Sequence, residues 1–314
     1  MRTPEDVSRR LKLRHLSILL GVMRWGSMAR AAEHLAISQP VVSKAILDLE
    51  NALGVCLLDR SPRGVEPTRY GRALAKRSGA IFNDLLASVR ELESLADPTA
   101  GELRIGSTEP MAAGLLSAIV DRLSRQYPRI AFHVVLGDLP RLRESELRDR
   151  EIDLLIGRMP NAVPAEDTQM DVLFDERTRV VAGVKNRWTH RRNLELEDLL
   201  DEPWCLPPPE SFPGSFIGSA FRARGLSVPK TAVTVHSIQM QIALLATGRF
   251  LTILPETMLR FSAKRLSLKA LPVDVAIEAT PVAIVTLTNR TPNPVTQLFI
   301  DCAREVVRPL AKRR

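Results

Sequence analysis

The clearest pattern of hydrophobic and polar positions lies in residues 26–54, where two amphipathic helices are predicted with a single break between them. Apolar residues of the first helix recur at helical spacing, at Met28, Ala31, Ala32 and Leu35. Those of the second helix recur at steps of four, three and four, at Val42, Ile46, Leu49 and Leu53. Each helix is therefore expected to bury one face and to leave the other face polar.

The break between the two helices carries residues that favour the start of a helix. Ser27 and Ser38 are of the type that caps the free N–H groups of a first turn, and Pro40 has a fixed φ that suits this position. Counted from Val42, three polar positions fall off the buried stripe: Gln39, Ser43 and Lys44. We expect these side chains to point to solvent, where a binding partner can reach them.

A hairpin and a long helix are predicted next. Residues 57–71 cannot continue a helix because the segment contains Pro62, Gly64 and Pro67, so a short wing of two strands is expected there. Helical spacing resumes at Thr68 and continues to Asp97, over some ~25 residues or ~38 Å. The sustained apolar stripe of this helix predicts pairing with a second copy of the chain, and packing on its own domain is the alternative.

From residue 101 onward, strand and helix signals alternate, which predicts parallel sheets built from βαβ units. Strands are expected at 102–107, 130–136, 153–157, 177–183, 204–206, 232–235, 251–254 and 281–287. Helices are expected at 111–126, 139–150, 195–200, 215–224, 237–246 and 295–310. The last strand and helix are expected to return to the first of two lobes, so the chain as a whole is predicted to be an α/β protein.

Length and composition are those of an ordinary globular protein of two or three domains. The chain has 314 residues, of which 45% are hydrophobic and 25% are charged. Apolar runs are too short for a membrane span, and charges interrupt the N-terminal segment that a signal peptide needs, so we expect a cytoplasmic protein without membrane contact. The cysteines are remote from one another and lack a CxxC pair, which favours small buried residues over a disulfide or a zinc site: Cys56, Cys205 and Cys302.

The distribution of charge narrows the function more than the net charge of +8 does. Residues 1–80 hold fourteen Lys and Arg against seven Asp and Glu, so nearly all of the excess lies in the first quarter of the chain. A basic module of this kind suits a polyanion such as nucleic acid, because neutralising phosphates releases counterions. A basic face that is only solvated is the alternative.

Motifs that would indicate an enzyme are missing from the sequence. The five histidines are scattered without an HExxH pair, and neither a GxSxG elbow nor a GxxxxGK phosphate loop occurs. His236 and Ser237 are adjacent, so on a strand their side chains would point to opposite sides. We therefore expect no catalytic residue, metal site or cofactor. The alternative to a nucleic-acid-binding protein is a small-molecule binding module whose N-terminal helices serve dimerisation.

A series of residues in the N-terminal segment resembles the LysR-type transcriptional regulators. The matching positions are Ala31, Ala32, Leu35, Ser38, Gln39, Pro40, Ser43, Leu49, Glu50, Leu53, Gly54, Leu58, Arg60, Thr68 and Gly71. The long helix and the α/β remainder extend the resemblance to essentially the whole chain, and regulators of sugar and aromatic-acid catabolism are the most similar subgroup. Two departures are mild: Val41 stands where Ala is usual, and Cys56 precedes Leu57 where Pro and Phe or Leu are common.

The resemblance implies a division into domains. Residues 11–68 would form a winged helix-turn-helix that binds DNA, and residues 69–97 a linker helix for dimerisation. Residues 101–168 and 270–310 would form one lobe, and residues 169–269 the other lobe, of an effector-binding domain similar to two-lobed periplasmic binding proteins. A small-molecule effector, either a sugar or an organic or aromatic acid, would bind between the lobes.

In such a protein, the helix that begins at Ser38 lies in the major groove of DNA with its first residues on the base edges. Gln39 would read adenine through two hydrogen bonds, and Pro40 would touch a thymine methyl group. Three side chains would hold phosphates or bases: Ser38, Ser43 and Lys44.

The wing would supply three further contacts. Arg63 at its tip would enter the minor groove, and Arg60 and Thr68 would anchor the DNA backbone or the wing itself. For Arg60 the alternative is an ion pair with Glu50 or Asp59 that only holds the wing in place.

Six residues are candidates for binding the effector on the same resemblance: Ser107, Thr108, Arg158, Phe212, Ser237 and Ile238. The serines and the threonine follow predicted strands and precede helices, a position that favours anions. Arg158 is a candidate charge partner for an anionic effector, and the two apolar residues would line the cleft. The alternatives are ordinary helix caps for the hydroxyl residues, a surface position at the hinge for Arg158, and core positions for Phe212 and Ile238.

The resemblance also implies partners. A homodimer or homotetramer would read an interrupted inverted repeat of double-stranded DNA in a promoter, and effector binding would change the angle between the lobes. RNA polymerase is a further partner that we expect.

Overall fold

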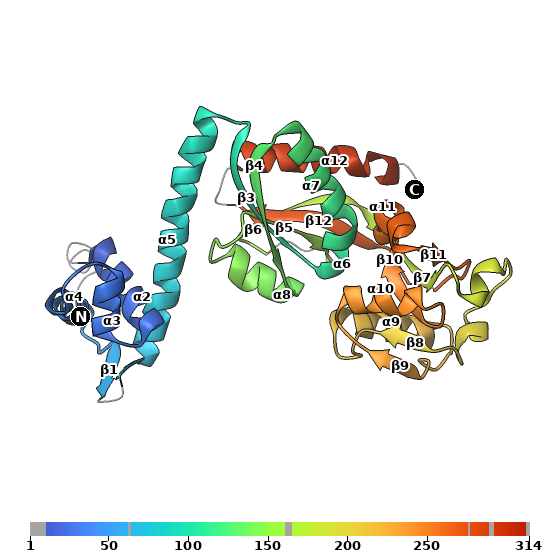
Figure 1. The fold of residues 1–314 in the computed structure, drawn as a ribbon, viewed down its shortest axis with the longest axis horizontal. Coiled ribbons are helices and arrows are strands. Elements are labelled where there is room, and N and C mark those ends of the chain that lie inside the picture. The colour runs from blue at the N-terminus through green and yellow to red at the C-terminus, as the bar shows by residue number, and fades with distance from the viewer. Residues whose placement is uncertain (1–10, 62–63, 161–164, 276, 289–291, 312–314) are drawn as a thin grey trace. The chain divides into compact units, whose positions relative to one another are not determined.

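The computed structural model describes residues 11–61, 64–160, 165–275, 277–288 and 292–311, with the backbone alone at Phe212, Lys264 and Ala311. The chain divides into two compact units (Figure 1). The first unit is Met1–Val89, with which Asp149–Glu151 are grouped, and the second is Arg90–Arg148 with Ile152–Arg314. The two units are described separately below.

The N-terminal unit begins with three helices: α2 (Leu13–Trp25), α3 (Met28–His34) and α4 (Gln39–Leu53). Their apolar stripes meet in one core, in which Leu19, Ala31 and Ile46 are completely buried. Leu35 and Leu53 are only partly buried, but the other members of both predicted stripes lie in the core. The two predicted helices and their buried faces are therefore confirmed.

The predicted hairpin is present as strands β1 (Leu58–Ser61) and β2 (Gly64–Pro67), which pair antiparallel. Its second strand is attached to the end of α2, because the N–H of Val65 donates to the carbonyl oxygen of Gly26 at 3.1 Å. Gly64 has a φ of +134°, and a Cβ atom there would lie 3.0 Å from the same carbonyl oxygen. A glycine is thus required where the wing approaches α2.

Helix α5 spans Arg69–Ala96, as the sequence predicts for residues 69–97. Its first turn lies against the start of the wing, since a Cβ atom on Gly71 would be 2.1 Å from the carbonyl oxygen of Leu57. Large apolar side chains are exposed along the helix, at Ile81, Leu85, Leu86, Val89, Leu92 and Leu95. Packing within the described chain therefore leaves most of the predicted stripe uncovered.

The first lobe of the second unit is built on a five-stranded sheet of order β4-β3-β5-β12-β6. Its strands are β3 (Ala100–Ser107), β4 (Arg129–Leu136), β5 (Leu154–Arg158), β6 (Thr168–Glu176) and β12 (Thr280–Leu287). Strand β12 is antiparallel to β5 and to β6, and the other pairs are parallel. Four strands consequently have their carboxyl ends at the same edge of the sheet.

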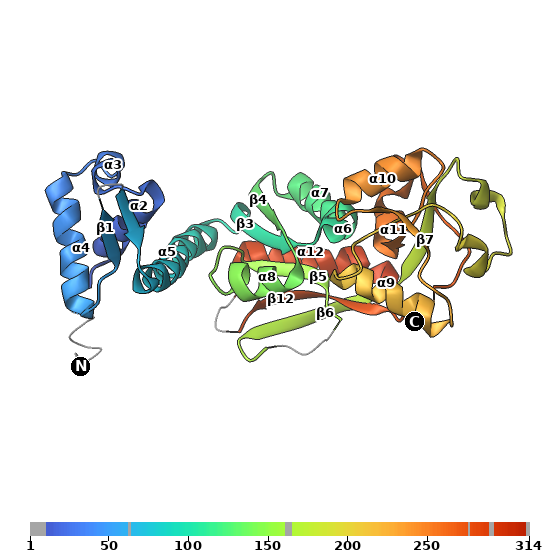
Figure 2. The same cartoon turned by 90° about the horizontal axis from the view of Figure 1, so that it is seen from below.

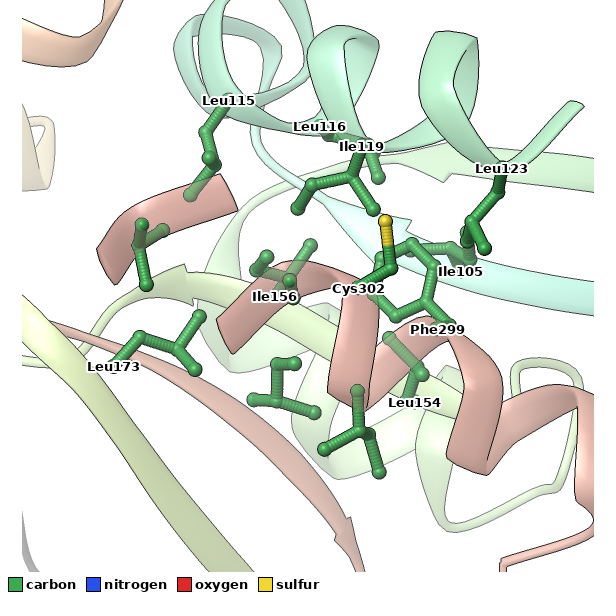
Figure 3. Packing of buried hydrophobic residues seen from close by; sticks show 14 of the residues in the cluster. Ile105, Leu115, Leu116, Ile119, Leu123, Leu154, Ile156, Leu173, Phe299 and Cys302 are labelled. Carbon is green, nitrogen blue, oxygen red and sulfur yellow. The ribbon is translucent and has the colours of Figure 1, made fainter. Parts of the chain in front are cut away.

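Helices cover both faces of this sheet. One face is covered by α12 (Pro294–Ala311) and by a continuous helical segment made of α6 (Glu109–Met111), the π-helical η1 (Ala112–Leu116) and α7 (Ser117–Gln126). Figure 3 shows Leu115, Ile119 and Leu123 of this segment above the sheet residues Ile105 and Ile156, with Phe299 and Cys302 of α12 beside them. The opposite face is covered by α8 (Leu139–Arg141) and the π-helical η2 (Leu142–Leu147).

The second lobe has a five-stranded sheet of order β11-β7-β10-β8-β9. The strands are β7 (Thr178–Gly183), β8 (Trp204–Leu206), β9 (Thr231–Thr234), β10 (Leu251–Pro255) and β11 (Leu268–Ala270). Strands β8, β9 and β10 are parallel, and β7 is antiparallel to β10. Its helices are α9 (Phe212–Ala223), α10 (Ile238–Ala246) and α11 (Glu256–Leu266), with two short 3-10 turns at Arg187–His190 and Glu197–Leu199. Figure 2 shows α9 and α10 on different sides of this lobe.

The sheets differ from the prediction in strand direction and in where the lobes meet. Each sheet is mixed rather than parallel, and strands β6 and β11 were not predicted. Strand β6 pairs with β12 along its length, so the first sheet continues to Glu176 instead of ending at residue 168. Val273 and Val275 belong to the core of the second lobe, so this lobe also extends beyond residue 269. Strand β6 lies at a sheet edge and its apolar run is only three residues long, at 172–174 between polar residues, which hid it from a search for apolar runs.

None of the helices in the described ranges combines the length and the apolar character that crossing a bilayer requires.

The cysteines differ in burial. Cys205 and Cys302 are buried, as expected, and burial raises the pKa of both thiols. Cys56 is exposed, so the prediction of a buried residue is wrong there, because the turn between α4 and β1 leaves it at the surface.

Candidate functional site

The start of α4 presents a polar surface to solvent. Ser38 is the N-cap residue, with extended backbone angles, and Gln39, Pro40 and Lys44 are exposed. The side chains of Ser27 and Ser38 make no capping hydrogen bond, so that part of the prediction is wrong. Because the buried face of the same helix holds Val42 and Ile46 in the core, the exposed residues have a fixed direction.

Ser43 differs from the other predicted residues of this surface. It is only partly exposed, and its hydroxyl donates to the sulfur of Met28 at 3.4 Å. The prediction that Ser43 points freely to solvent therefore needs correction: its position, one residue after Val42, places it at the margin between the buried and the polar face. Its hydroxyl couples α4 to the first residue of α3.

Glu50 near the end of α4 holds the wing. Its carboxylate accepts hydrogen bonds from the backbone N–H of Leu57 at 2.8 Å and of Leu58 at 3.3 Å. The same carboxylate lies 3.9 Å from the guanidinium of Arg60, whose side chain is 49% exposed. The ion pair that was an alternative for Arg60 is thus present, and the exposed remainder of this guanidinium stays accessible to a phosphate.

Thr68 fastens the other end of the wing. Its hydroxyl donates to the carbonyl oxygen of Cys56 at 2.8 Å and accepts from the N–H of Gly71 at 3.1 Å, so it also caps α5. This arrangement supports the anchoring of the wing that the sequence analysis assigned to Thr68. Arg63, predicted at the wing tip, lies outside the described residues.

A large cavity opens between the two lobes of the second unit, with a volume of about 1110 Å³. It lies where both sheets end: Leu136 and Arg158 close β4 and β5 of the first lobe, and Pro255 closes β10 of the second. Thr178, the first residue of β7, lines it as well. Ligands of α/β sheets bind beyond such carboxyl ends, so the topology alone favours a binding site here.

The structure brings some of the six predicted effector residues to this cavity and not others. Thr108, Arg158 and Ile238 line it. Ser107 is buried and donates to the carbonyl oxygen of Ile156 at 3.1 Å, and Ser237 accepts from the N–H of Met240 as a cap of α10. Neither serine is among the lining residues. The alternative of an ordinary helix cap is present at Ser237, whereas Ser107 is not a cap, because Thr108 is the N-cap of α6. Phe212 begins α9, but its side chain lies outside the described part of the chain.

Buried polar groups gather at the end of the cavity where the chain passes between the lobes. Arg158, Glu176 and Thr280 lie at one edge of the first sheet, because Val282 pairs with Arg158 and Thr280 pairs with Glu176. The guanidinium Nη2 of Arg158 donates to the hydroxyl of Thr280 at 3.3 Å, and its Nε is buried without a partner. Burial lowers the pKa of Arg158, and the charge of Glu176 opposes this change.

Glu176 is 1% exposed and contacts the start of α11. Its Oε1 accepts from the N–H of Thr257 at 3.0 Å and also from the hydroxyl of Thr257. Its Oε2 and the hydroxyl of Thr178 are buried without a hydrogen-bond partner. Burial raises the pKa of Glu176, while the hydrogen bonds from Thr257 and the charge of Arg158 act in the opposite direction.

Sequence reasoning missed Thr178, Glu176 and Thr280 in this cluster. They lie 18 to 122 residues from Arg158. Glu176 and Thr280 meet Arg158 because β12 pairs with both β5 and β6, and Thr178 begins β7 two residues after Glu176. The sequence offered no signal for Glu176: it follows Asp175 directly, and its burial depends on the unpredicted strand β6. Within the described ranges no three His, Cys, Asp or Glu residues are placed to hold a metal ion.

Two family profiles match the chain. The LysR substrate binding domain matches residues 96–308, and the bacterial regulatory helix-turn-helix of the lysR family matches residues 13–72. The first match alone covers more than half of the 314 residues. Its limits coincide with the two lobes, and those of the second with the helices and wing of the N-terminal unit.

Individual regulators are also similar to this chain over most of its length. The chain is 29% identical to the HTH-type transcriptional regulator GbpR of Azospirillum brasilense over 286 residues, which are 91% of this chain and 83% of that protein. It is 26% identical to the HTH-type transcriptional regulator PcaQ of Agrobacterium fabrum over 299 residues, or 95% and 96% of the two chains. The crystal structure of full-length CbnR complexed with its target DNA is similar in fold, with a TM-score of 0.70 at 20% identity, and covers 94% of this chain and 100% of that one.

Proposed function

Because the chain belongs to the LysR family of bacterial transcriptional regulators, we propose that it binds a promoter as a homodimer or homotetramer and that a small molecule bound between its lobes controls this binding. The family consists of transcriptional regulators and not of enzymes. In this family the helix-turn-helix domain binds DNA and the two-lobed domain binds the effector. The finer roles of individual residues below are our proposals.

The observation that carries the DNA-binding proposal is the exposed start of α4 on a helix whose other face is buried. Gln39 and Pro40 are exposed in its first turn and Lys44 follows one turn later, all three free of contacts that would hide them. In a major groove the first residues of such a helix reach base edges. We assign adenine reading to Gln39, a thymine methyl contact to Pro40, and phosphate or base contacts to Ser38, Ser43 and Lys44.

The wing and its supports complete the DNA surface. The attachment of β1 to Glu50 and of β2 to Gly26 supports a wing with one preferred position relative to α4. From that position Arg60 would reach the DNA backbone with its exposed side, and Thr68 would hold the wing rather than the DNA. Arg63 at the wing tip remains our candidate for the minor groove.

Pairing of two chains through α5 is the second part of the proposal. Its 28 residues correspond to ~42 Å of helix, and six large apolar side chains are exposed along it. A second copy of the same helix would cover them, which supports a dimer that spaces two helix-turn-helix units on an interrupted inverted repeat. Contact with RNA polymerase and a location in the cytoplasm complete the proposal.

The cavity between the lobes supports effector control. A molecule that fills it touches both sheets, through Thr108 and Arg158 on one side and Ile238 on the other. It will shift the angle between the lobes only if it binds one arrangement more tightly than the other.

The experiment that tests the proposal is selection of sheared DNA of the source organism by the purified full chain, with the bound fragments sequenced at several salt concentrations. Enrichment of one interrupted inverted repeat, with binding that weakens steeply as salt rises, is the expected result. A folded oligomer that enriches no sequence at any salt would contradict it and would favour a small-molecule binding module whose N-terminal helices serve dimerisation.

A further inference from the structure

Charges that line the cavity differ in whether the protein already compensates them. Glu109 and Asp138 lie at the starts of α6 and α8, where the N–H groups of a first turn favour negative charge, and Asp138 accepts from the N–H of Arg141. Arg143 lies 3.6 Å from Glu144. Arg158 is the remaining guanidinium of the lining, and among the described residues the one side chain to which it donates is Thr280, at 3.3 Å.

The environment of Arg158 leaves its charge poorly compensated. A guanidinium carries five N–H donors and stays charged, and a buried charge is costly unless it is paired and hydrogen-bonded. No carboxylate of the described residues makes an ion pair with Arg158. Glu176 acts on it through its charge alone, with Oε1 engaged by Thr257 and Oε2 without a hydrogen-bond partner. The Nε of Arg158 is a buried donor without an acceptor. This end of the cavity is therefore electrostatically incomplete without an anion.

The rest of the wall is mainly apolar, and two of its hydrogen-bond donors are already engaged within the protein: Ser211 donates to the carbonyl oxygen of Pro208 at 2.6 Å, and Gln241 to that of Val235 at 3.3 Å. Large apolar side chains come from both lobes, among them Leu139, Leu155, Met159, Phe216, Ile217 and Ile253. Six of the lining residues are prolines, which have no backbone N–H to offer a ligand. A sugar would leave most of its hydroxyl groups without partners against such a wall, whereas a hydrocarbon or aromatic body would be desolvated favourably.

We propose that the effector is a monocarboxylate with an apolar body, and that Arg158 binds its carboxylate at the edge of the first sheet while the apolar body lies between the lobes. The inference rests on the proposed effector control and decides between the sugar and the acid that the sequence left open. The hydroxyl of Thr178, buried without a partner on the cavity wall, is the second group available to the carboxylate. A carboxylate fits the guanidinium through paired hydrogen bonds as well as charge.

The position of Arg158 connects this ligand with the angle between the lobes. Arg158 ends β5 in the first lobe, and Thr178 begins β7 in the second lobe, two residues after Glu176 ends β6 of the first sheet. A carboxylate held by both side chains would link the last residue of β5 in the first lobe to the first residue of β7 in the second lobe. It would favour the lobe arrangement in which both distances are short, which is the unequal binding that control requires.

The test is calorimetric titration of the full-length protein with matched probes. Benzoate, phenylacetate and hexanoate supply the carboxylate and an apolar body, their neutral amides keep the body alone, acetate keeps the carboxylate alone, and D-galactose and D-glucose represent sugars. We expect at least one of the three carboxylates to bind about tenfold or more tightly than its amide and than acetate. Binding of a sugar without binding of any carboxylate, equal binding of acid and amide, or no binding of any acid would each overturn the inference.

Variants locate the carboxylate. Arg158→Gln should weaken the binding of the acid about tenfold or more and leave the binding of the amide within about twofold. Because the single variant removes the cation opposite buried Glu176, the double variant Arg158→Gln with Glu176→Gln is made as well, which replaces both charges by neutral groups of similar size. Arg104→Gln is the control, since Arg104 pairs with Glu102 and does not line the cavity. Acid binding that survives in the folded double variant contradicts the assignment to Arg158.

The same preparation is tested for selection of genomic DNA without any ligand. A protein that selects an inverted repeat but binds sugars instead of carboxylates would remain a regulator and lose only the ligand class proposed here. A protein that binds the carboxylates through Arg158 and selects no DNA would keep the ligand class and lose the regulatory function.

Discussion

The exposed surface of α4 and the cavity between the lobes differ in how the sequence assembles them. The residues proposed to meet DNA at the helix start lie within 38–44, so the helical period alone decides which of them are exposed. The cavity collects Thr108, Arg158, Thr178 and Ile238, whose nearness depends on strand order in two sheets. A local surface can therefore be inferred from periodicity, whereas a site at sheet edges needs the topology.

The charged side chains of the two regions also differ in how far they are buried. On α4 the basic and polar side chains are solvated, so each is expected to contribute modestly and in a salt-dependent way. At the cavity, Glu176 is buried and Arg158 has a buried donor without a partner. Removing the charge of one of them therefore changes the electrostatic energy of the other. Substitutions in the two regions should thus differ in size and in their response to salt and pH.

The largest expected effect tests whether the N-terminal unit depends on its own core. Leu49→Ala removes a completely buried side chain of α4 and should lower the free energy of unfolding of this unit by about 2 to 5 kcal/mol. Urea unfolding should show an earlier first transition, and the transition of the two-lobed unit should not move. Leu47→Ala, at a position 52% exposed on the same helix, should change stability by no more than about 0.5 kcal/mol. Equal effects of the two variants would contradict the buried face assigned to α4.

A smaller effect is expected at the support of the wing. Glu50→Ala leaves the N–H groups of Leu57 and Leu58 without their acceptor and should cost about 1 to 3 kcal/mol of stability. DNA affinity should fall as well, because the wing loses its fixed position. Glu33→Ala, an exposed acidic residue of α3, is the charge-matched control and should alter neither stability nor the wing. Loss of DNA affinity of the same size in both variants would show that net charge, and not the wing, is responsible.

Base reading should be visible in specificity more than in affinity. Gln39→Ala should reduce discrimination at one base pair of the operator by about 1 to 3 kcal/mol, because the two hydrogen bonds to adenine are lost. Competition binding with operators changed one base pair at a time measures this effect. Asn51→Ala, on an exposed position near the end of the same helix, should leave the preference unchanged. An unchanged preference in Gln39→Ala would show that the helix is oriented differently on DNA.

The success of sequence reasoning follows the same division. Helices α3 and α4, the wing and α5 were predicted from helical period, turn residues and a proline stop, whereas α2, which packs against them, was not predicted. In the two-lobed unit the central strands β3, β5 and β10 were predicted as apolar runs, but β6 was not, because this edge strand is half polar and its apolar run is only three residues long. Arg158 could be named because it follows the predicted strand 153–157, whereas Glu176 and Thr280 became its neighbours only through the pairing of β12 with β5 and β6.

The buried acid at the cavity should make stability depend on pH. Burial raises the pKa of Glu176 in the folded protein above its value of ~4.3 in the unfolded chain, so the folded state binds more protons between these two pKa values. Stability should therefore decrease as pH rises through that window, although Arg158 and Thr257 oppose part of the change and Glu256 adds to it.

Glu176→Gln should remove this decrease, which urea unfolding of the two-lobed unit at a series of pH values measures. The control is Glu256→Gln, which changes a partly exposed acid that pairs with Arg179 at 3.5 Å and should preserve most of the decrease. A wild-type protein whose stability rises with pH over this window would contradict the burial of an uncompensated carboxyl group at Glu176.

The smallest effect is expected at Arg60, whose guanidinium both pairs with a carboxylate of the protein and is exposed to solvent. Its ion pair with Glu50 spans 3.9 Å and its side chain is 49% exposed, so Arg60→Gln should change stability by only about 0 to 1 kcal/mol. If the exposed side of the guanidinium also neutralises a phosphate, the slope of log affinity against log salt should become smaller by about one unit. Arg24→Gln, an exposed arginine near the end of α2, provides the slope expected from a general loss of one charge. A slope for Arg60→Gln no different from that of Arg24→Gln would leave Arg60 as a support of the wing alone, and the basic excess of this unit would then act on DNA through other residues.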